Sequence, residues 1–152
     1  QNVMTEFNIP FNDDKIEQLV GMWNKNWMLA EPYEEVHEVL AQLKENHQLV
    51  LVSNTDSIAV NNILEKFDLR KHFDHIFMSC EMGTIKTDEH FFSSILKQLE
   101  LQPEECIMVG DSIQSDIIAA KQQGLQAVLI DRRNTRDFPK KIITLHELQE
   151  YL

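Results

Sequence analysis

Two aspartates five positions apart carry the clearest chemical signal in this sequence. Asp111 and Asp116 lie in the segment 109–116, which follows a short apolar run and leads into a helical pattern. Mg²⁺ prefers hard oxygen ligands and commonly binds one or two carboxylates together with phosphate oxygens and water. Helix capping explains one acid at a helix start, but not a second acid placed inward among apolar helix positions. The pair therefore favours a metal site, with Asp111 and Asp116 as candidate ligands.

Two further polar segments follow apolar runs and could bind an anion. Ser53 and Asn54 come directly after the run Leu49–Val52, where a hydroxyl and free backbone N–H groups can hold a phosphate. Ordinary capping of the next helix is the alternative interpretation. Lys86 lies in a loop that Gly83 makes flexible, and it could neutralise negative charge, although an isolated loop lysine is usually only solvated. Neither segment is specific by itself.

Alternating strands and helices must position these polar segments. Apolar spacing predicts helices near residues 14–29, 36–43, 60–67, 91–99, 113–120 and 145–151, and strands at 49–52, 76–78, 106–109 and 127–130. Four apolar strands that alternate with helices predict an α/β fold, in which helices cover both faces of a parallel sheet. Ligands bind at the carboxyl ends of such strands, so the candidate residues should converge at one edge.

Composition argues against several classes of function. The chain has 152 residues, of which 43% are hydrophobic, enough for one domain with a core. A net charge of −11 argues against a nucleic acid partner. The longest apolar runs are far too short to cross a bilayer, which argues against a membrane partner. Cys80 and Cys106 are expected to be buried thiols, which fits a reducing, cytoplasmic compartment.

Together these segments resemble the motifs of the haloacid dehalogenase (HAD) superfamily in their order and strand context. The resemblance rests on Ser53-Asn54, on Lys86 in a Gly-x-x-Lys-x-Asp loop, and on Gly110-Asp111-Ser112 with Asp116. It runs from about Tyr33 to the C-terminus and implies a HAD-like Rossmannoid sheet. Residues 1–31 would then be the last part of a helical cap, and residues 32–152 the α/β core.

The resemblance also implies a role for each residue. Ser53 and the backbone of Asn54 would bind the transferring phosphoryl group. Lys86 would orient the nucleophile and neutralise the phosphate. Asp111 would bind Mg²⁺, and Asp116 would support the metal site directly or through water. The implied substrate is a small phosphorylated molecule.

One part of the family pattern is absent before Ser53. The family nucleophile comes from an Asp-x-Asp motif after the first strand, and the only nearby acidic pair, Asp13-Asp14, has no apolar strand leading into it. The missing strand would be central, between the strands that end at Ser53 and Gly110. We therefore expect the folded form to include a strand from elsewhere, either a missing N-terminal segment of the same protein or a complementing chain.

The implied function is a Mg²⁺-dependent phosphohydrolase that acts through an aspartyl-phosphate, with the nucleophile outside this chain. A catalytically inactive fragment, or a module that binds phosphate and metal, is the alternative. A haloacid dehalogenase is a less favoured alternative, because a dehalogenase needs no metal. Without a metal, the carboxylates of Asp111 and Asp116 would only repel each other. A nucleotide-binding or response-regulator-like domain is a weaker alternative, because such a domain does not require Ser53, Lys86 and the pair Asp111 and Asp116 together.

Overall fold

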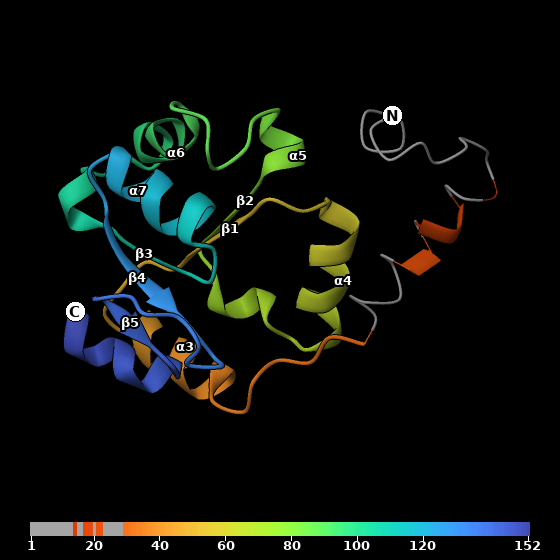
Figure 1. Cartoon of the computed structure of the whole chain (residues 1–152), viewed down its shortest axis with the longest axis horizontal. Helices are drawn as coiled ribbons and strands as arrows, with labels where there is room; N and C mark the ends of the chain where they lie inside the picture. Colours follow the sequence, from red (N-terminus) through yellow and green to blue (C-terminus); the bar gives the residue numbers. More distant parts are fainter. Residues whose placement is uncertain (1–13, 15–16, 20, 23–28) are drawn as a thin grey trace.

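The computed structural model describes residues 14, 17–19, 21–22 and 29–152. The cap helix expected over residues 14–29 therefore lies mostly outside the described part of the chain. In the remainder, helices lie on both sides of a layer of parallel strands (Figure 1). Within the described residues, no helix has the length and apolar character needed to cross a membrane.

The strands form two separate parallel sheets instead of one. They are β1 (Val50–Ser53), β2 (His75–Met78), β3 (Ile107–Gly110), β4 (Gln126–Ile130) and β5 (Lys141–Ile142). One sheet has the order β1-β2 and the other the order β3-β4-β5, and no ladder joins β1 to β3 in the described chain. The four predicted strands are present within a residue or so of their expected ends, whereas β5 was not predicted.

The helical elements follow the predicted alternation, with changes in type. The α-helices are α3 (Val36–Lys44), α4 (Ser57–Lys66), α5 (Ser79–Met82), α6 (Phe91–Leu99) and α7 (Ala119–Gln122). The tighter 3₁₀ elements are η1 (Arg70–His72), η2 (Pro103–Glu105) and η4 (Leu145–Tyr151), and η3 (Ile113–Ile118) is a π-helix. A single helix was predicted over 113–120, but the chain there forms η3 followed by α7.

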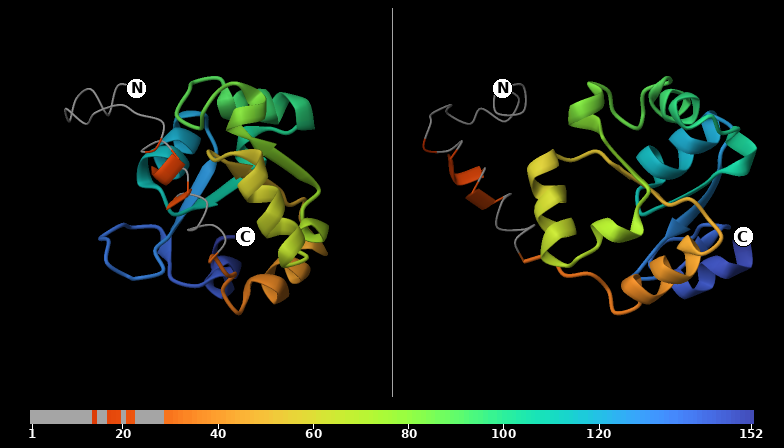
Figure 2. Two further views of the ribbon diagram at one scale, coloured as in Figure 1. Left: turned by 90° about the vertical axis from the view of Figure 1, so that its right-hand side faces the viewer. Right: turned by 180° about the vertical axis from the view of Figure 1, so that it is seen from behind.

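Two apolar clusters cover opposite faces of β4. The first contains Ala127 and Leu129 of β4, together with residues of β2, α6, η3 and α7. The second contains Val128, which points the other way along the strand, and residues of α3, β5 and η4. In Figures 1 and 2, α3 and η4 lie side by side on this second face. Burial on both faces explains why the strands read as continuous apolar runs.

Polar groups close the turns between these elements. Asp56 caps α4, because its side chain accepts a hydrogen bond from Ala59 N at 2.8 Å. Gly124 follows α7 with a φ of +85°, a conformation that glycine adopts without strain. The Asp88 carboxylate accepts a hydrogen bond from Ile85 N at 3.0 Å and closes its own loop.

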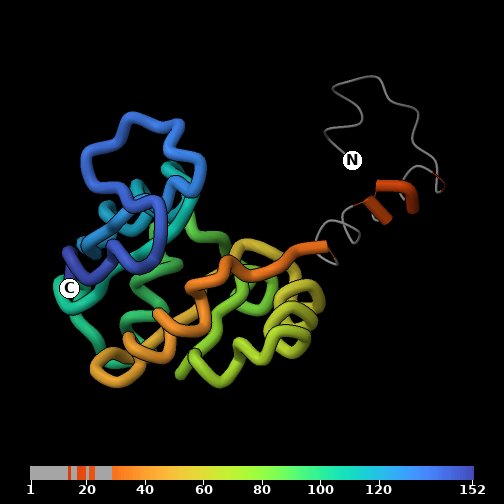
Figure 3. The backbone as a smooth tube through the Cα atoms, turned by 90° about the horizontal axis from the view of Figure 1, so that it is seen from below, coloured from red at the N-terminus to blue at the C-terminus, as the bar shows by residue number. Residues whose placement is uncertain are grey.

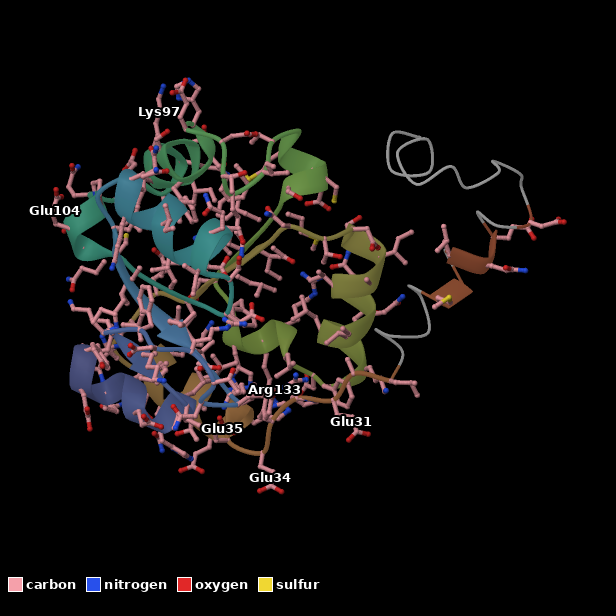
Figure 4. All side chains as sticks on the ribbon, in the orientation of Figure 1. Glu31, Glu34, Glu35, Lys97, Glu104 and Arg133 are labelled. Atoms are coloured by element: carbon pink, nitrogen blue, oxygen red, sulfur yellow. The ribbon has the colours of Figure 1, made fainter. Side chains whose placement is uncertain are left out.

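The loop between β4 and β5, residues 131–140, projects from the body in Figures 2 and 3. Its base is fixed to the start of α3. Glu35, labelled in Figure 4, pairs with Arg132 and also accepts a hydrogen bond from Leu145 N at 3.3 Å. The Arg132 guanidinium lies 4.0 Å from the centroid of the Tyr33 ring. These contacts join the chain before α3 to the β3-β4-β5 half.

Candidate active site

The structure brings the four main candidate side chains to one cavity. Ser53 ends β1, Lys86 lies in the loop after α5, and Asp111 and Asp116 follow β3. All four line a cavity of about 740 Å³ between the two sheets. The carboxyl ends of β1 and β3 therefore meet at this edge, as expected for parallel strands.

Lys86 contacts residues that follow both β1 and β3 at this edge of the cavity. Its side chain is buried, with the residue only 8% exposed, and its Nζ donates to Asp116 Oδ1 at 2.8 Å. Its backbone N–H donates to Asn54 Oδ1 at 3.0 Å, so the amide side chain after β1 fixes the loop that carries the lysine. A buried lysine held by partners from both sheets is unlike a solvated loop lysine.

Asp116 is held by the unusual start of η3. The residue is 4% exposed, and its second oxygen accepts a hydrogen bond from Ser112 N at 3.0 Å. The backbone N–H groups of Asp116 and Ile117 both reach Ser112 O, at 3.0 and 3.2 Å, which opens the turn into a π-helix. Such π turns recur at functional sites. Here the turn directs a carboxylate inward beneath the end of β3.

Asp111 differs from Asp116 in its surroundings. It is exposed and lines the cavity, and no donor among the described residues reaches its carboxylate. Its backbone carbonyl accepts a hydrogen bond from Arg136 in the 131–140 loop. Nothing in the sequence singled out Arg136, because it lies 25 positions beyond Asp111 and outside every motif. Asn54 was expected to act through its backbone, and its side-chain bond to Lys86 was also unforeseen.

The donor set is compatible with a magnesium ion. Asp111 offers a free carboxylate, whereas both oxygens of Asp116 already accept hydrogen bonds. No group of three or more histidine, cysteine or acidic side chains with metal-site geometry occurs among the described residues. Mg²⁺ commonly takes one or two carboxylates and completes its shell with water and phosphate oxygens. The residues present would therefore hold the ion with help from substrate or from another carboxylate.

The same cavity extends along the whole length of the gap between the sheets. Every residue of β1 and every residue of β3 lines it. Apolar side chains of α3 and η4 line it as well: Leu40, Leu43, Leu145 and Leu148. Because among the described residues β1 pairs only with β2, and β3 only with β4, each strand presents an edge to the cavity that no described strand pairs with. We call this cavity the inter-sheet slot.

The two cysteines differ from their expected burial. Cys80 is exposed at the surface of α5, so the expectation that it is a buried thiol was wrong. Cys106 is half-buried and lines the inter-sheet slot just before β3. Burial, and to a smaller extent the charge of Glu105, raises the pKa of the Cys106 thiol. Because it lines the slot, this thiol is a natural reporter on it.

Comparisons with known proteins identify the family of this chain. The family model for haloacid dehalogenase-like hydrolases matches residues 1–130. The chain is 27% identical over 118 residues to a glyceraldehyde 3-phosphate phosphatase of Methanothermobacter thermautotrophicus, covering 77% of this chain and 52% of that protein. It is 33% identical over 101 residues to a phosphoserine phosphatase of Thermus thermophilus, covering 66% and 41%. The chain thus spans about half the length of these curated relatives.

Solved structures share the fold. A HAD phosphatase from Thermococcus onnurineus superposes with a TM-score of 0.75 at 24% identity, covering 97% of this chain and 67% of that one. The putative HAD-hydrolase YfnB from Bacillus subtilis, bound to magnesium, gives a TM-score of 0.73 at 17% identity, covering 97% and 86%. These two likenesses show the shared fold. The family-model match over residues 1–130 shows that the chain belongs to the haloacid dehalogenase-like hydrolase family.

Proposed function

We propose that this chain forms most of the catalytic core of a Mg²⁺-dependent phosphohydrolase that acts on a small phosphate monoester. The buried Lys86, paired with Asp116 at the edge where Ser53 and Asp111 also lie, is the observation that carries the proposal. A cation and a hydroxyl beside a free carboxylate suit a dianionic phosphate better than an uncharged substrate. The similarity to two phosphatases supports this class of substrate.

Each residue of the chain has a separate task in this proposal. The Ser53 hydroxyl and the Asn54 backbone N–H donate to phosphoryl oxygens, and Lys86 offsets their negative charge. Asp111 would hold the magnesium ion, while Asp116 keeps Lys86 in place through its 2.8 Å contact and supports the metal site. When bound, Mg²⁺ reduces the repulsion between the phosphate and an attacking carboxylate.

The nucleophile has to come from outside the described chain. An aspartate oxygen attacks phosphorus, the P–O ester bond breaks, and the alcohol leaves with a proton. Water then cleaves the aspartyl-phosphate, which regenerates the carboxylate and releases inorganic phosphate. No acid among the described residues reaches Lys86 except Asp116, which is already committed to it.

The inter-sheet slot suits a strand that brings this aspartate. Its long walls are the unpaired edges of β1 and β3, which can both bond to one inserted strand. Helices α3 and η4 cover one of its faces with leucines, so an inserted strand should carry apolar residues. If it runs parallel to β1 and β3, its carboxyl end emerges beside Lys86. We therefore propose an upstream segment or complementing chain of the form apolar strand, then Asp-x-Asp.

Hydrolysis of p-nitrophenyl phosphate tests the proposal. The 152-residue chain with Mg²⁺ should show no turnover above buffer. The same chain extended at its N-terminus by an apolar strand and Asp-x-Asp should turn over, and Asp111→Asn in the extended chain should abolish it. Asp111-dependent turnover by the unextended chain would remove the need for an added strand. An extended chain that folds and binds orthovanadate without turnover would favour the inactive binding module.

A further inference from the structure

Helix α3 spans the two halves of the split sheet. Its buried residues Val39 and Leu43 pack with Val128, Ile142 and Leu148 of the β3-β4-β5 half. On another flank, His37 and Lys44 contact η1 and the chain after it, which belong to the β1-β2 half. Because Leu40 and Leu43 also line the inter-sheet slot, α3 covers one side of it.

The contact to η1 is a pair of histidines. His37 Nδ1 lies 3.2 Å from His72 Nε2, and the two ring centroids are 5.4 Å apart at an angle of 62°. A hydrogen bond between two imidazole nitrogens needs one to donate and the other to accept. If both rings are protonated, both nitrogens carry protons and both rings are cations, so the bond is replaced by repulsion.

The neighbouring charges do not favour a second proton. His72 is 6% exposed. Burial is the main factor that lowers the pKa of His72, followed by the charges of His37, Lys71 and Lys44, while Asp68 acts in the opposite direction. Asp74 already pairs with Lys44 at 2.9 Å, and Lys44 also donates to His72 O at 3.4 Å. The cationic side chains of Lys44 in α3 and Lys71 in η1 therefore both lie near the His37–His72 contact and disfavour a second proton there.

We propose that His37 and His72 form a proton-sensitive latch that holds α3 to the β1-β2 half and so keeps the inter-sheet slot covered. With one proton shared between the rings, the latch is closed. With a proton on each, the latch opens and α3 remains attached through its apolar face and through the contacts of Lys44 with Asp74 and with His72 O. The latch depends on the fold alone and does not require the phosphatase chemistry proposed above.

The direction of the pH effect follows from the state of His72. An unperturbed histidine has a pKa near 6.5, and burial lowers the pKa of His72 below that. The folded chain therefore binds fewer protons than the unfolded chain in this range. Stability from the latch is fully present above about pH 6.5 and is lost as the pH falls through and below that value.

NMR titration and amide exchange test the latch directly. In the 152-residue chain, His72 should titrate below the ordinary histidine pKa of about 6.5. His37→Gln, which removes the partner's charge, should move the His72 titration upward, whereas His146→Gln should leave it unchanged. An unchanged His72 titration in His37→Gln would overturn the proposal.

Amide protection gives the structural readout. Between about pH 7.5 and 5.5, protection of the α3 amides should fall after correction for intrinsic exchange. The amides of α6, Phe91–Leu99, serve as an internal reference and should change little. The fall should be smaller in His37→Gln. Equal loss of protection in α3 and α6 would indicate global acid unfolding and would also overturn the latch.

Discussion

Lys86, in the loop after α5, and Asp116, in η3, form a buried ion pair although they are 30 positions apart in sequence. Their side chains are only 9% and 5% exposed, so removal of one partner leaves the other charge without water or counter-ion. Breaking such a pair typically costs about 3–5 kcal/mol. Such a cost is a large part of the stability of an ordinary domain, which is about 5–15 kcal/mol.

We expect Lys86→Met to lower the free energy of unfolding by about 3 kcal/mol in urea titrations at pH 7. Adding Asp116→Asn, which removes the orphaned charge and keeps an acceptor for Ser112 N, should recover more than about 1 kcal/mol. Lys71→Met is the matched control, because its pair with Asp68 lies at the surface and should matter far less. A double variant as unstable as Lys86→Met would contradict the ion-pair explanation.

The candidate residues could be found in the sequence because their types and strand contexts are local features. Ser53, Lys86, Asp111 and Asp116 all follow an apolar strand directly or by one loop, and the structure brings them to one cavity. Their contacts could not be predicted. Arg136 reaches Asp111 O only because the 131–140 loop folds back, and nothing in the local pattern indicates that path. The roles of these residues in catalysis stay predictions.

The junction between β3 and η3 depends on close packing of two elements. A side chain on Gly110 would collide with the Asp116 carboxylate, because the position of its Cβ falls on top of that group. The glycine is therefore required by the inward turn of η3 and not by a positive φ, since none is recorded for it. The end of β3, Gly110 and Asp116 therefore depend on one another for their positions.

Gly110→Ala should displace Asp116 and weaken its contact with Lys86. We expect a loss of about 1–3 kcal/mol in the free energy of unfolding, as for other overpacked interiors. Gly21→Ala provides the control, since an added Cβ there meets no atom of the described residues within 4 Å. If thermal unfolding shows equal losses for the two variants, the packing at Gly110 is not as tight as the structure indicates.

Element boundaries were predictable where apolar periodicity is strong. β1, β2, β3 and β4 and helices α3, α4 and α6 agree with the spacing of their apolar residues. β5 has only two residues, too few to show any period, and its pairing with β4 is a long-range contact. The π turn of η3 was missed because it depends on Ser112 O accepting two backbone N–H groups, which apolar spacing does not report.

At the scale of the molecule, the two half-sheets are joined mainly by helices. The cluster with Phe77, Phe91 and Ala127 joins them on one face, and α3 joins them on the other. The sequence predicted that the strands ending at Ser53 and Gly110 lack a shared neighbour, and the structure shows no direct pairing between them in the described chain. The sequence did not predict that the gap between β1 and β3 remains open as a cavity.

A strand in the inter-sheet slot should protect Cys106 from modification. In a Cys80→Ser background, Cys106 is the one remaining thiol of the chain and lines the slot. A synthetic peptide of about five valine and isoleucine residues followed by Asp-Leu-Asp should slow its reaction with an aromatic disulfide reagent about tenfold at saturation. At about a hundredfold excess over its Kd, the peptide should also raise the free energy of unfolding by about 2.7 kcal/mol.

A peptide of the same composition with one central proline is the control for this experiment, because proline cannot complete the ladder. It should give neither protection nor stabilisation. Equal protection by both peptides would mean that they bind as apolar ligands and not as strands. Lack of protection by either would mean that the slot does not admit a strand.

The two open strand edges also bear on how long the chain persists in a cell. Unpaired apolar strands are the surfaces that self-associate, and transiently open chains are the ones that chaperones and proteases remove. A polypeptide that fills the gap between β1 and β3 would hide both edges at once. We therefore expect the steady-state abundance of this chain to follow the supply of its central strand, so that orphaned copies are degraded before they accumulate as idle hydrolase cores.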